Sequence, residues 1–360
     1  MRRALVIPAL LVAAYLGYGL SVRAHRAPRP PLPPGEIHGA YHVHTSRSDG
    51  RGSLAEVVRA ARQAGLQFVV VTDHNVLTPG DAGWREGVLV IEGSEVSAPY
   101  GHIVALGVSR ELSKDERQKD AIGHILELGG RPVLAHPFHP RRPFTRWGKA
   151  GWTGFEVVSS DSLWGWAVKE RGLGRMALAL LDFPWDPARS VLDFYRYPAR
   201  ELARFDELNR APGGGPGRPS HPLLCASDAH GYPSYLAAFE AFSMHLAVTP
   251  SGDASVDTRA IVDGLLDGSA VCVFDGVAPA WGVRLSPEPG GDRIRLSFST
   301  PDPSPASFRL FRDGAPAAPL EAGPGGGTFS CGGPCAGHAW RAEGTWKGRP
   351  WLFTNPLRIE

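Results

Sequence analysis

Two histidines one residue apart open the part of the sequence that is richest in reactive side chains. His42 and His44 flank Val43, and Asp49 follows five positions after the second histidine. The preceding run, Glu36 to Ala40, is typical of a strand, so the pair lies where a strand passes into a loop. Alternate residues of a strand point to the same side. We therefore expect His42 and His44 to face one point, as two ligands of one metal ion would.

Further imidazoles and carboxylates accompany the apolar, strand-like runs that follow. In chain order these are Asp73 and His74, Glu95, His102, His136, Asp228 and His230. A single histidine is more often a hydrogen-bonded structural residue than a metal ligand, so the prediction of metal ligands depends on the whole set. In a barrel of alternating strands and helices, all strand ends open on one face. Carboxylates at that density would repel one another unless cations neutralise them, so the pattern predicts a metal centre.

Taken jointly, these motifs resemble the PHP (polymerase and histidinol phosphatase) domain of metal-dependent hydrolases. The resemblance covers roughly Glu36 to Gly276. It rests on five ordered motifs: His42-Val43-His44-Thr45, Thr72-Asp73-His74-Asn75, Glu95 with Gly101-His102, Ala135-His136-Pro137, and Ser227-Asp228-Ala229-His230-Gly231. The resemblance implies an α/β fold, a distorted (β/α)7 barrel, with two or three divalent metal ions at its mouth.

Carried over position by position, the resemblance implies three metal sites. The first is held by His42, His44, Glu95 and Asp228, the second by Glu95, His102 and His136, and the third by Asp49, His74 and His230. Glu95, Asp228 and His230 are the residues expected to take part in catalysis. Asp49 stands where a common family pattern has a histidine, which leaves the identity and occupancy of the third metal open.

Imidazole and carboxylate ligands suit zinc, manganese or iron, and ligand type does not choose among them. A water molecule that bridges two such cations loses a proton near neutral pH and becomes a nucleophile. This chemistry favours an enzyme, a metal-dependent phosphoesterase that acts on small phosphate esters, on nucleotides or, as a 5′-3′ exonuclease would, on oligonucleotide 5′ ends. Two alternatives stay open. The subgroup that the chain most resembles is similar to carbaryl hydrolase, which implies a carbamate or carboxyl-ester hydrolase, and a non-catalytic metal-stabilised binding module is the other.

Two features next to the metal motifs carry hypotheses of their own. Arg141 and Arg142 follow His136 on a loop expected to rim the mouth, and guanidinium groups pair well with phosphate. We interpret them as candidate substrate-binding residues, against the alternative of an ordinary solvated basic loop. Asp73 either orients a metal ligand or caps the loop that follows it.

The N-terminal residues predict export. Met1-Arg2-Arg3 precedes the apolar run Ala4 to Leu20, so residues 1–26 are expected to be a cleaved signal peptide or a retained membrane anchor. Residues 27–35 form a Pro-rich linker. The body is then periplasmic or extracellular, and membrane-attached if the segment is retained.

Residues 36–277 are expected to form the metallohydrolase domain, closed by a helix over Asp257 to Leu266 and a strand over Ser269 to Phe274. Residues 278–360 alternate at the period of strands and predict a small C-terminal β-sandwich. Cys331 and Cys335 are expected to form a short disulfide, with a metal pair as the alternative. Cys225 and Cys272 lie in predicted strands and are interpreted as core residues.

Composition adds little about partners. The chain has 360 residues with 38 basic and 36 acidic side chains, a formal net charge of +2. This near balance gives no support for a dedicated nucleic-acid binder. We expect a small phosphorylated or ester substrate, or a short nucleic acid, and no dedicated protein partner is evident.

Overall fold

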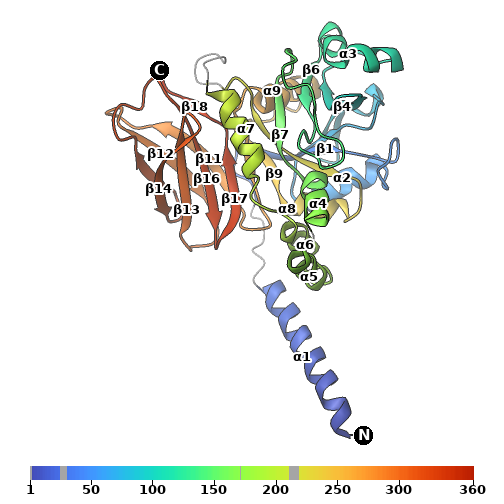
Figure 1. Cartoon of the computed structure of the whole chain (residues 1–360), viewed down its shortest axis with the longest axis vertical. Helices are drawn as coiled ribbons and strands as arrows, with labels where there is room; N and C mark the ends of the chain where they lie inside the picture. The colour runs from blue at the N-terminus through green and yellow to red at the C-terminus, as the bar shows by residue number, and fades with distance from the viewer. Residues whose placement is uncertain (1, 25–30, 171, 211–218) are drawn as a thin grey trace.

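The computed structural model describes residues 2–24, 31–170, 172–210 and 219–360. A long N-terminal helix projects from the body, which consists of an α/β barrel and a β-rich C-terminal region (Figure 1). Residues 25–30, where the predicted N-terminal segment meets the predicted linker, and residues 211–218 lie outside the described residues.

Seven strands close into a barrel, because β1 pairs with both β2 and β8. Their order around the ring is β1 (Ile37–Val43), β2 (Phe68–Val71), β4 (Val88–Ala98), β5 (Gly101–Leu106), β6 (Arg131–Leu134), β7 (Gly154–Ser159) and β8 (Leu223–Ala229). The short η1 (Pro79–Asp81) and β3 (Gly83–Arg85) lie between β2 and β4 along the chain. All residues of β2 are buried, as expected of a strand covered on both faces. The predicted seven-stranded α/β barrel is thus observed.

One strand breaks the parallel pattern. β5 runs antiparallel to both of its neighbours, β4 and β6, whereas β1, β2 and β4 pair in parallel, as do β6, β7 and β8. The start of β5 therefore lies at the mouth where the neighbouring strands end. His102, the second residue of β5, reaches the mouth for this reason and not because it follows a strand end.

Helices pack against the strands of the barrel. They are α2 (Leu54–Gln63), α3 (Lys114–Glu127), α4 (Ser160–Lys169), α7 (Ala199–Asn209), α8 (Tyr235–Ala241) and α9 (Ala254–Leu266), while α6 (Pro187–Asp193) packs on α8 and α5 (Leu173–Asp182) packs on α6. A capping box begins α2: the Ser53 side chain accepts a hydrogen bond from the Glu56 backbone, and the Glu56 side chain accepts one from the Ser53 backbone. Each reciprocal bond satisfies a backbone donor that the first helical turn leaves without a partner.

The expected closing strand does not belong to the ring. β10 (Val271–Val273) pairs with β9 (Ser243–Leu246) and with β17 (Arg349–Thr354), and β9 pairs antiparallel with the first half of β1. The prediction that Ser269 to Phe274 closes the barrel is therefore wrong, because the β1–β8 pairing already does so. β10 instead connects the barrel to the C-terminal region.

The C-terminal region is β-rich, as predicted. β13 (Ala306–Arg312), β14 (Ala315–Ala322), β16 (Ala339–Trp346), β17 and the short β18 (Leu357–Arg358) extend the large sheet, while β11 (Trp281–Pro287), β12 (Arg293–Ser299) and β15 (Gly327–Ser330) form a second one. Residues of both sheets share one hydrophobic cluster that includes Phe298, Phe308 and Trp351. Because one of these sheets continues into the barrel, the description as a separate β-sandwich stays a prediction.

The N-terminal helix α1 (Arg2–Ala24) contains, among the described residues, the one stretch that is long and apolar enough to cross a membrane, Ile7–Ala24. Its apolar side chains are largely exposed, for example Ile7, Leu11 and Leu20. A signal sequence near the N-terminus has the same length and apolar composition. A cleaved signal peptide and a retained membrane anchor therefore both stay predictions.

All four cysteines are paired. Cys331 and Cys335 form the predicted short disulfide. Cys225 of β8 and Cys272 of β10 are also bonded, across 47 positions of sequence, with their Cα atoms 5.9 Å apart. Both are buried, which confirms the interpretation as core residues. The bond between them was not predicted, because it joins two strands that are far apart in the sequence.

Candidate metal centre

The predicted ligands converge at the mouth of the barrel. His42 and His44 come from the end of β1, Glu95 lies within β4, and Asp228 lies within β8. His74 forms an isolated bridge to Glu95, and His136 and His230 follow β6 and β8. The ring nitrogens Nε2 of His42 and His44 lie 3.0 Å apart. This expected convergence does not come from plain strand alternation, because the register of β1 shifts between Ala40 and Val43.

Glu95 lies at the centre of the group. Its Oε2 is 3.2 Å from Nε2 of His42, 3.2 Å from Nε2 of His44 and 3.1 Å from Nδ1 of His74. Its Oε1 is 2.7 Å from Nδ1 of His102 and 2.8 Å from Nε2 of His136. One fully buried carboxylate thus faces five imidazoles, which is the position that the sequence assigned to a bridging ligand.

Asp228 is the second carboxylate of this group. Its Oδ1 lies 3.3 Å from Nε2 of His44 and 3.6 Å from Nε2 of His42. His230, two residues later, turns its Nδ1 back to the Asp228 carbonyl oxygen at 2.9 Å. That contact leaves Nε2 of His230 free to face Asp49.

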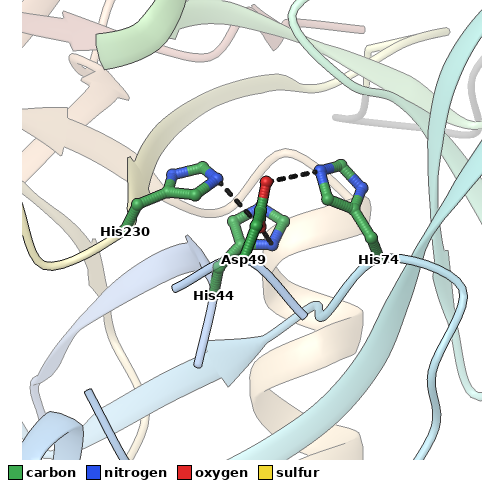
Figure 2. A group of neighbouring side chains, drawn as sticks. All are labelled: His44, Asp49, His74 and His230. Atoms are coloured by element: carbon green, nitrogen blue, oxygen red, sulfur yellow. Dashed lines mark ion pairs between the residues drawn. The ribbon is translucent and has the colours of Figure 1, made fainter. Parts of the chain in front are cut away.

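The third predicted site gathers around Asp49, and Figure 2 shows its carboxylate between the rings of His230 and His74. Asp49 Oδ1 lies 3.3 Å from Nε2 of His230, and Oδ2 lies 3.5 Å from Nε2 of His74. Nδ1 of His44 is 3.6 Å from Asp49 Oδ1. His44 therefore joins this group, to which the sequence did not assign it. The four ligand atoms all lie within 4.8 Å of one another.

The residues at the mouth fit divalent cations. Glu95 Oε2 and His74 Nδ1 are buried and only 3.1 Å apart, yet neither has a hydrogen-bond partner in the described part of the chain. Buried polar atoms without partners are costly, and facing each other in this way suits two ligands of one cation. Imidazole and carboxylate donors favour zinc, manganese or iron.

The charges of the site are strongly coupled. Burial lowers the pKa of the His42 imidazole, but the carboxylates of Glu156 and Asp228 outweigh it and hold the pKa well above its ordinary value. Burial raises the pKa of Glu95, but the facing His42 and hydrogen bonds from His102 hold it well below its ordinary value. A positive charge is thus favoured at this position, and a bound cation would displace the imidazole protons.

Sequence reasoning missed Glu156, which holds two of the predicted ligands. Its Oε1 is 2.6 Å from Nδ1 of His42, and its Oε2 accepts the backbone N–H of His136 at 2.6 Å. Glu156 is the fully buried charged residue of β7, between Phe155 and Val157. A charged residue inside an otherwise apolar strand was the available signal.

Asp73 holds the loop that carries Asp49. It accepts hydrogen bonds from the backbone N–H of Thr45 at 2.8 Å, the Thr45 hydroxyl at 2.7 Å and the Ser48 hydroxyl at 2.5 Å. It therefore fastens the first loop, and neither orients a histidine directly nor acts only on the loop that follows it.

Three of the predicted ligands have left-handed backbone conformations. The φ angles of His42, His136 and Asp228 are 65°, 27° and 45°. Such a conformation costs a non-glycine residue about 1–3 kcal/mol and persists where the surroundings impose it, typically at functional sites. The strained backbone at these three positions directs their side chains toward the metal centre.

A cavity of about 410 Å³ adjoins the metal centre. Asp228, His230 and Arg142 contribute to its wall, together with apolar side chains such as Trp164, Phe183 and Phe194. Arg142 also pairs with Asp161 at 3.2 Å. Of the two arginines singled out in the sequence, the structure brings Arg142 to the cavity, while Arg141 is exposed and is not among the described residues that line it.

Comparison with known proteins gives weak similarities. No protein-family model matches the chain. An uncharacterised protein of Methanocaldococcus jannaschii is 27% identical over 114 residues, which is 28% of this chain and 67% of that protein. These values do not establish a family.

Two solved structures are similar at low identity. A two-domain protein of Bacteroides vulgatus, described as containing a predicted PHP-like metal-dependent phosphoesterase, is 13% identical over 92% of this chain and 99% of its own, with a TM-score of 0.40. An amidohydrolase of Chromobacterium violaceum with bound sulfate is 19% identical over 40% of this chain and 82% of its own, with a TM-score of 0.28.

Proposed function

We propose that this chain is an exported metal-dependent hydrolase of the PHP type that cleaves phosphate esters. The observation that carries the proposal is the arrangement around Glu95, a fully buried carboxylate that faces five imidazoles at the mouth of a seven-stranded barrel. The same class is named for the Bacteroides vulgatus protein, although that likeness is too weak to support the proposal by itself.

The proposed ligands are the nine residues assigned from the sequence: His42, His44, Asp49, His74, Glu95, His102, His136, Asp228 and His230. When bound there, two or three divalent cations would supply an activated water molecule and neutralise charge on the phosphoryl oxygens. Glu156 holds the His42 ring by its Nδ1, so that Nε2 faces Glu95. Asp73 keeps Asp49 in place through the first loop, and Arg142 offers its guanidinium to the phosphate from the cavity wall.

One observation favours a second candidate, the hydrolysis of a carbamate or carboxyl ester. The wall of the cavity beside Asp228 and His230 is mostly apolar, with Trp164 and Phe194 among its side chains. An apolar wall suits an apolar, uncharged substrate, and a carbamate or carboxyl ester is uncharged whereas a phosphate ester is an anion.

The disulfides support the export part of the proposal. Two disulfides are typical of oxidising compartments and rare in the cytosol. An N-terminal apolar run that follows Arg2 and Arg3 agrees with this location.

The proposal is tested by measuring bound metals and hydrolysis on one sample of the full chain. The substrates are a generic phosphodiester, a phosphomonoester, a 5′-phosphorylated oligonucleotide and a carbamate ester. We expect two or three metal ions at the mouth and turnover of at least one phosphate ester. His42→Ala and Glu95→Gln should abolish that turnover, whereas His124→Ala, on the exposed side of α3, should not.

Turnover of the carbamate ester alone would replace the first candidate by the second. Bound metal without turnover of any of these substrates would support the binding-module interpretation and contradict the proposed hydrolase.

A further inference from the structure

A second group of metal-binding side chains lies at the opposite end of β1 from His42. Glu36 precedes the strand, His38 is its second residue, and His245 of β9 pairs with His38 in register. Glu36 Oε1 is 2.6 Å from Nε2 of His38 and 3.6 Å from Nδ1 of His245. The two rings are stacked with centroids 3.3 Å apart, and both are about 3% exposed.

Ser243 and Asp275 orient the His245 ring through its Nε2. Its Nε2 lies 3.0 Å from the Ser243 hydroxyl and 3.3 Å from Oδ1 of Asp275. A carboxylate behind a histidine in this way fixes the ring and raises its basicity toward a metal. Nδ1, which points to Glu36, is buried and has no hydrogen-bond partner within the described ranges.

We propose that Glu36, His38 and His245 bind a zinc ion that is separate from the metals at the mouth. The donors are Oε1 of Glu36, Nε2 of His38 and Nδ1 of His245, and all three lie within 4.8 Å of one another. Tetrahedral zinc with bonds of about 2.0–2.2 Å holds its ligands about 3.3–3.6 Å apart. Binding would therefore separate Glu36 Oε1 from His38 Nε2, now 2.6 Å apart, and turn one of the two stacked rings so that both lone pairs point at the ion. Water takes the fourth position.

The role of this zinc is structural. Glu36 Oε2 accepts the backbone N–H of Gly282 at 2.7 Å, in the first strand of the C-terminal region. The ion would therefore fasten the start of β1, strand β9 and strand β11 to one another. The apolar cavity and the proposed ligands at the mouth take no part.

Anomalous diffraction at the zinc edge on crystals of the full chain tests this site. We expect a peak between Glu36, His38 and His245, and folded His245→Gln should bind one zinc fewer per chain while hydrolysing phosphate esters as before. His338→Gln, a half-exposed histidine paired with Asp313, should retain all zinc. Zinc peaks at the mouth without one here, or an unchanged zinc content in folded His245→Gln, would overturn the proposal. If His245→Gln does not fold, the anomalous map of the wild type alone decides between these outcomes.

A different observation concerns α5, an apolar helix that the body leaves uncovered. Leu173 and Leu180 are each 73% exposed, and Leu178, Leu181 and Phe183 are 44–49% exposed. Exposed apolar surface of this kind marks an interaction site. Figure 1 shows α5 at the end of the body from which α1 projects.

The apolar helix α1 packs against the same segment. The Tyr15 hydroxyl donates to the Leu181 carbonyl at 3.1 Å, the Tyr18 hydroxyl contacts the Asp182 carboxylate, and Arg23 Nε donates to the Trp185 carbonyl at 3.4 Å. Tyr15 lies in the middle of the candidate span Ile7–Ala24. A helix that crosses a bilayer in this position therefore brings the end of α5 below the surface of the bilayer.

The cavity beside the metal centre extends to this helix. Its lining includes Asp228 and His230 at one end, and Leu180, Phe183, Trp164 and Phe194 elsewhere. One cavity thus joins the proposed metal ligands to the side chains that α5 exposes.

We infer that α5 lies in the surface of a lipid bilayer and that the substrate is an amphiphilic phosphate ester drawn from it. This inference rests on the proposed phosphoesterase function for its substrate, but not for its membrane contact. The apolar chain of the substrate would occupy the wall formed by Leu180, Phe183 and Phe194, with its phosphate toward Arg142 and the metal ligands.

Fluorescence quenching tests the membrane contact without any activity. All four native cysteines are paired, so a cysteine introduced by Leu180→Cys takes a fluorescent label alone. In vesicles that contain spin-labelled lipid, we expect this label to be quenched several-fold more than one at Val256→Cys, an exposed apolar position on α9. Equal quenching at the two positions would overturn the membrane contact.

The substrate class is tested by two assays on the full chain in the same vesicles. Leu173→Glu with Leu178→Glu, two exposed positions of α5 that do not line the cavity among the described residues, should leave hydrolysis of a water-soluble phosphodiester unchanged and lower that of phosphatidic acid about tenfold. Soluble turnover without hydrolysis of the lipid, or an equal rate on the lipid in variant and wild type, would overturn the lipid substrate. Loss of turnover on both substrates in the wild type would contradict the phosphoesterase function itself, while the quenching result would still decide the membrane contact.

Discussion

Glu95 and Glu156 are both buried glutamates at the mouth of the barrel, yet they differ in what they face. Glu95 Oε2 faces three imidazole nitrogens without a hydrogen-bond partner in the described part of the chain, whereas both oxygens of Glu156 are engaged by His42 and His136. Glu95 is therefore suited to bind a cation, and Glu156 to hold the side chains that do so. The difference depends on tertiary contacts.

Replacing Glu156 tests this division of roles. Glu156→Gln keeps the shape of the side chain but loses the carboxylate that orients His42. We expect the affinity for metal at the mouth to fall about 10–100-fold, as is typical when an outer partner of a metal ligand is removed. Competition with a chelator measures it, with Glu127→Gln on the surface of α3 as the control. An affinity equal to that of the wild type would contradict the role of Glu156.

At the residue scale, the sequence predicted which side chains gather at the mouth, because polar residues beside apolar strand runs stand out. His102 was included among the residues beside strand-like runs, although the premise that such residues follow strand ends does not hold for it. Glu156 was missed because its importance depends on the distance to His42, which lies 114 positions earlier in the chain.

At the scale of elements, a buried ion cluster joins α7 to β16. Arg341 donates to both oxygens of Asp206 at 2.6 Å and to Glu343 at 2.6 Å, and it is about 2% exposed. Periodicity predicted the C-terminal strands, but not that an arginine of β16 would neutralise an aspartate of α7. Helix and strand patterns specify which face is buried, not the partner that it meets.

Removing the arginine should strongly destabilise the chain. Arg341→Met leaves the carboxylates of Asp206 and Glu343 buried without their counter-ion, which typically costs about 3–5 kcal/mol. Denaturant unfolding measures the change in the free energy of unfolding. Arg309→Met is the matched control, because Arg309 pairs with the same Glu343 but is half-exposed, and such pairs contribute about 0–1 kcal/mol. Equal losses in the two variants would refute the role given to Arg341.

Strand β4 carries a carboxylate, Glu92, whose effect on the stability of the fold depends on pH. Burial raises the pKa of Glu92 to about 7, although the neighbouring Arg47 and Arg85 oppose this. The folded state then binds a proton more tightly than the unfolded state, so this contribution to stability is present below about pH 4.5 and is lost as the pH rises through 7. Glu92→Gln should therefore melt at a higher temperature than the wild type at pH 8, with the difference shrinking toward pH 5. A difference that does not change with pH would disprove the assignment.

At the scale of the whole molecule, the barrel and the C-terminal region form one continuous sheet through β9, β10 and β17. The change of pattern near Val277 predicted where the C-terminal strands begin. It could not predict that they continue the barrel sheet, because strand neighbours far apart in sequence are chosen by tertiary packing. The disulfide between Cys225 and Cys272 lies at this junction.

The two disulfides should differ in their effect on stability. Closing 47 positions removes more entropy from the unfolded chain than closing 4, with contributions of about 4 and about 2 kcal/mol in the loop-closure estimate. The double variant Cys225→Ala with Cys272→Ala should therefore lower the melting temperature more than Cys331→Ala with Cys335→Ala. Calorimetry of both variants checks this, and a larger loss in the second would contradict it.

The most direct test of the proposed hydrolase is to titrate metal back into chelated protein while following phosphodiester hydrolysis. The wild type should show no turnover when metal-free and should regain it as the sites at the mouth fill. Glu95→Gln should stay inactive at every metal concentration, because it lacks the carboxylate that faces five imidazoles. Full turnover by the metal-free protein, or restoration of Glu95→Gln to the wild-type rate, would contradict a metal-dependent phosphoesterase built around Glu95.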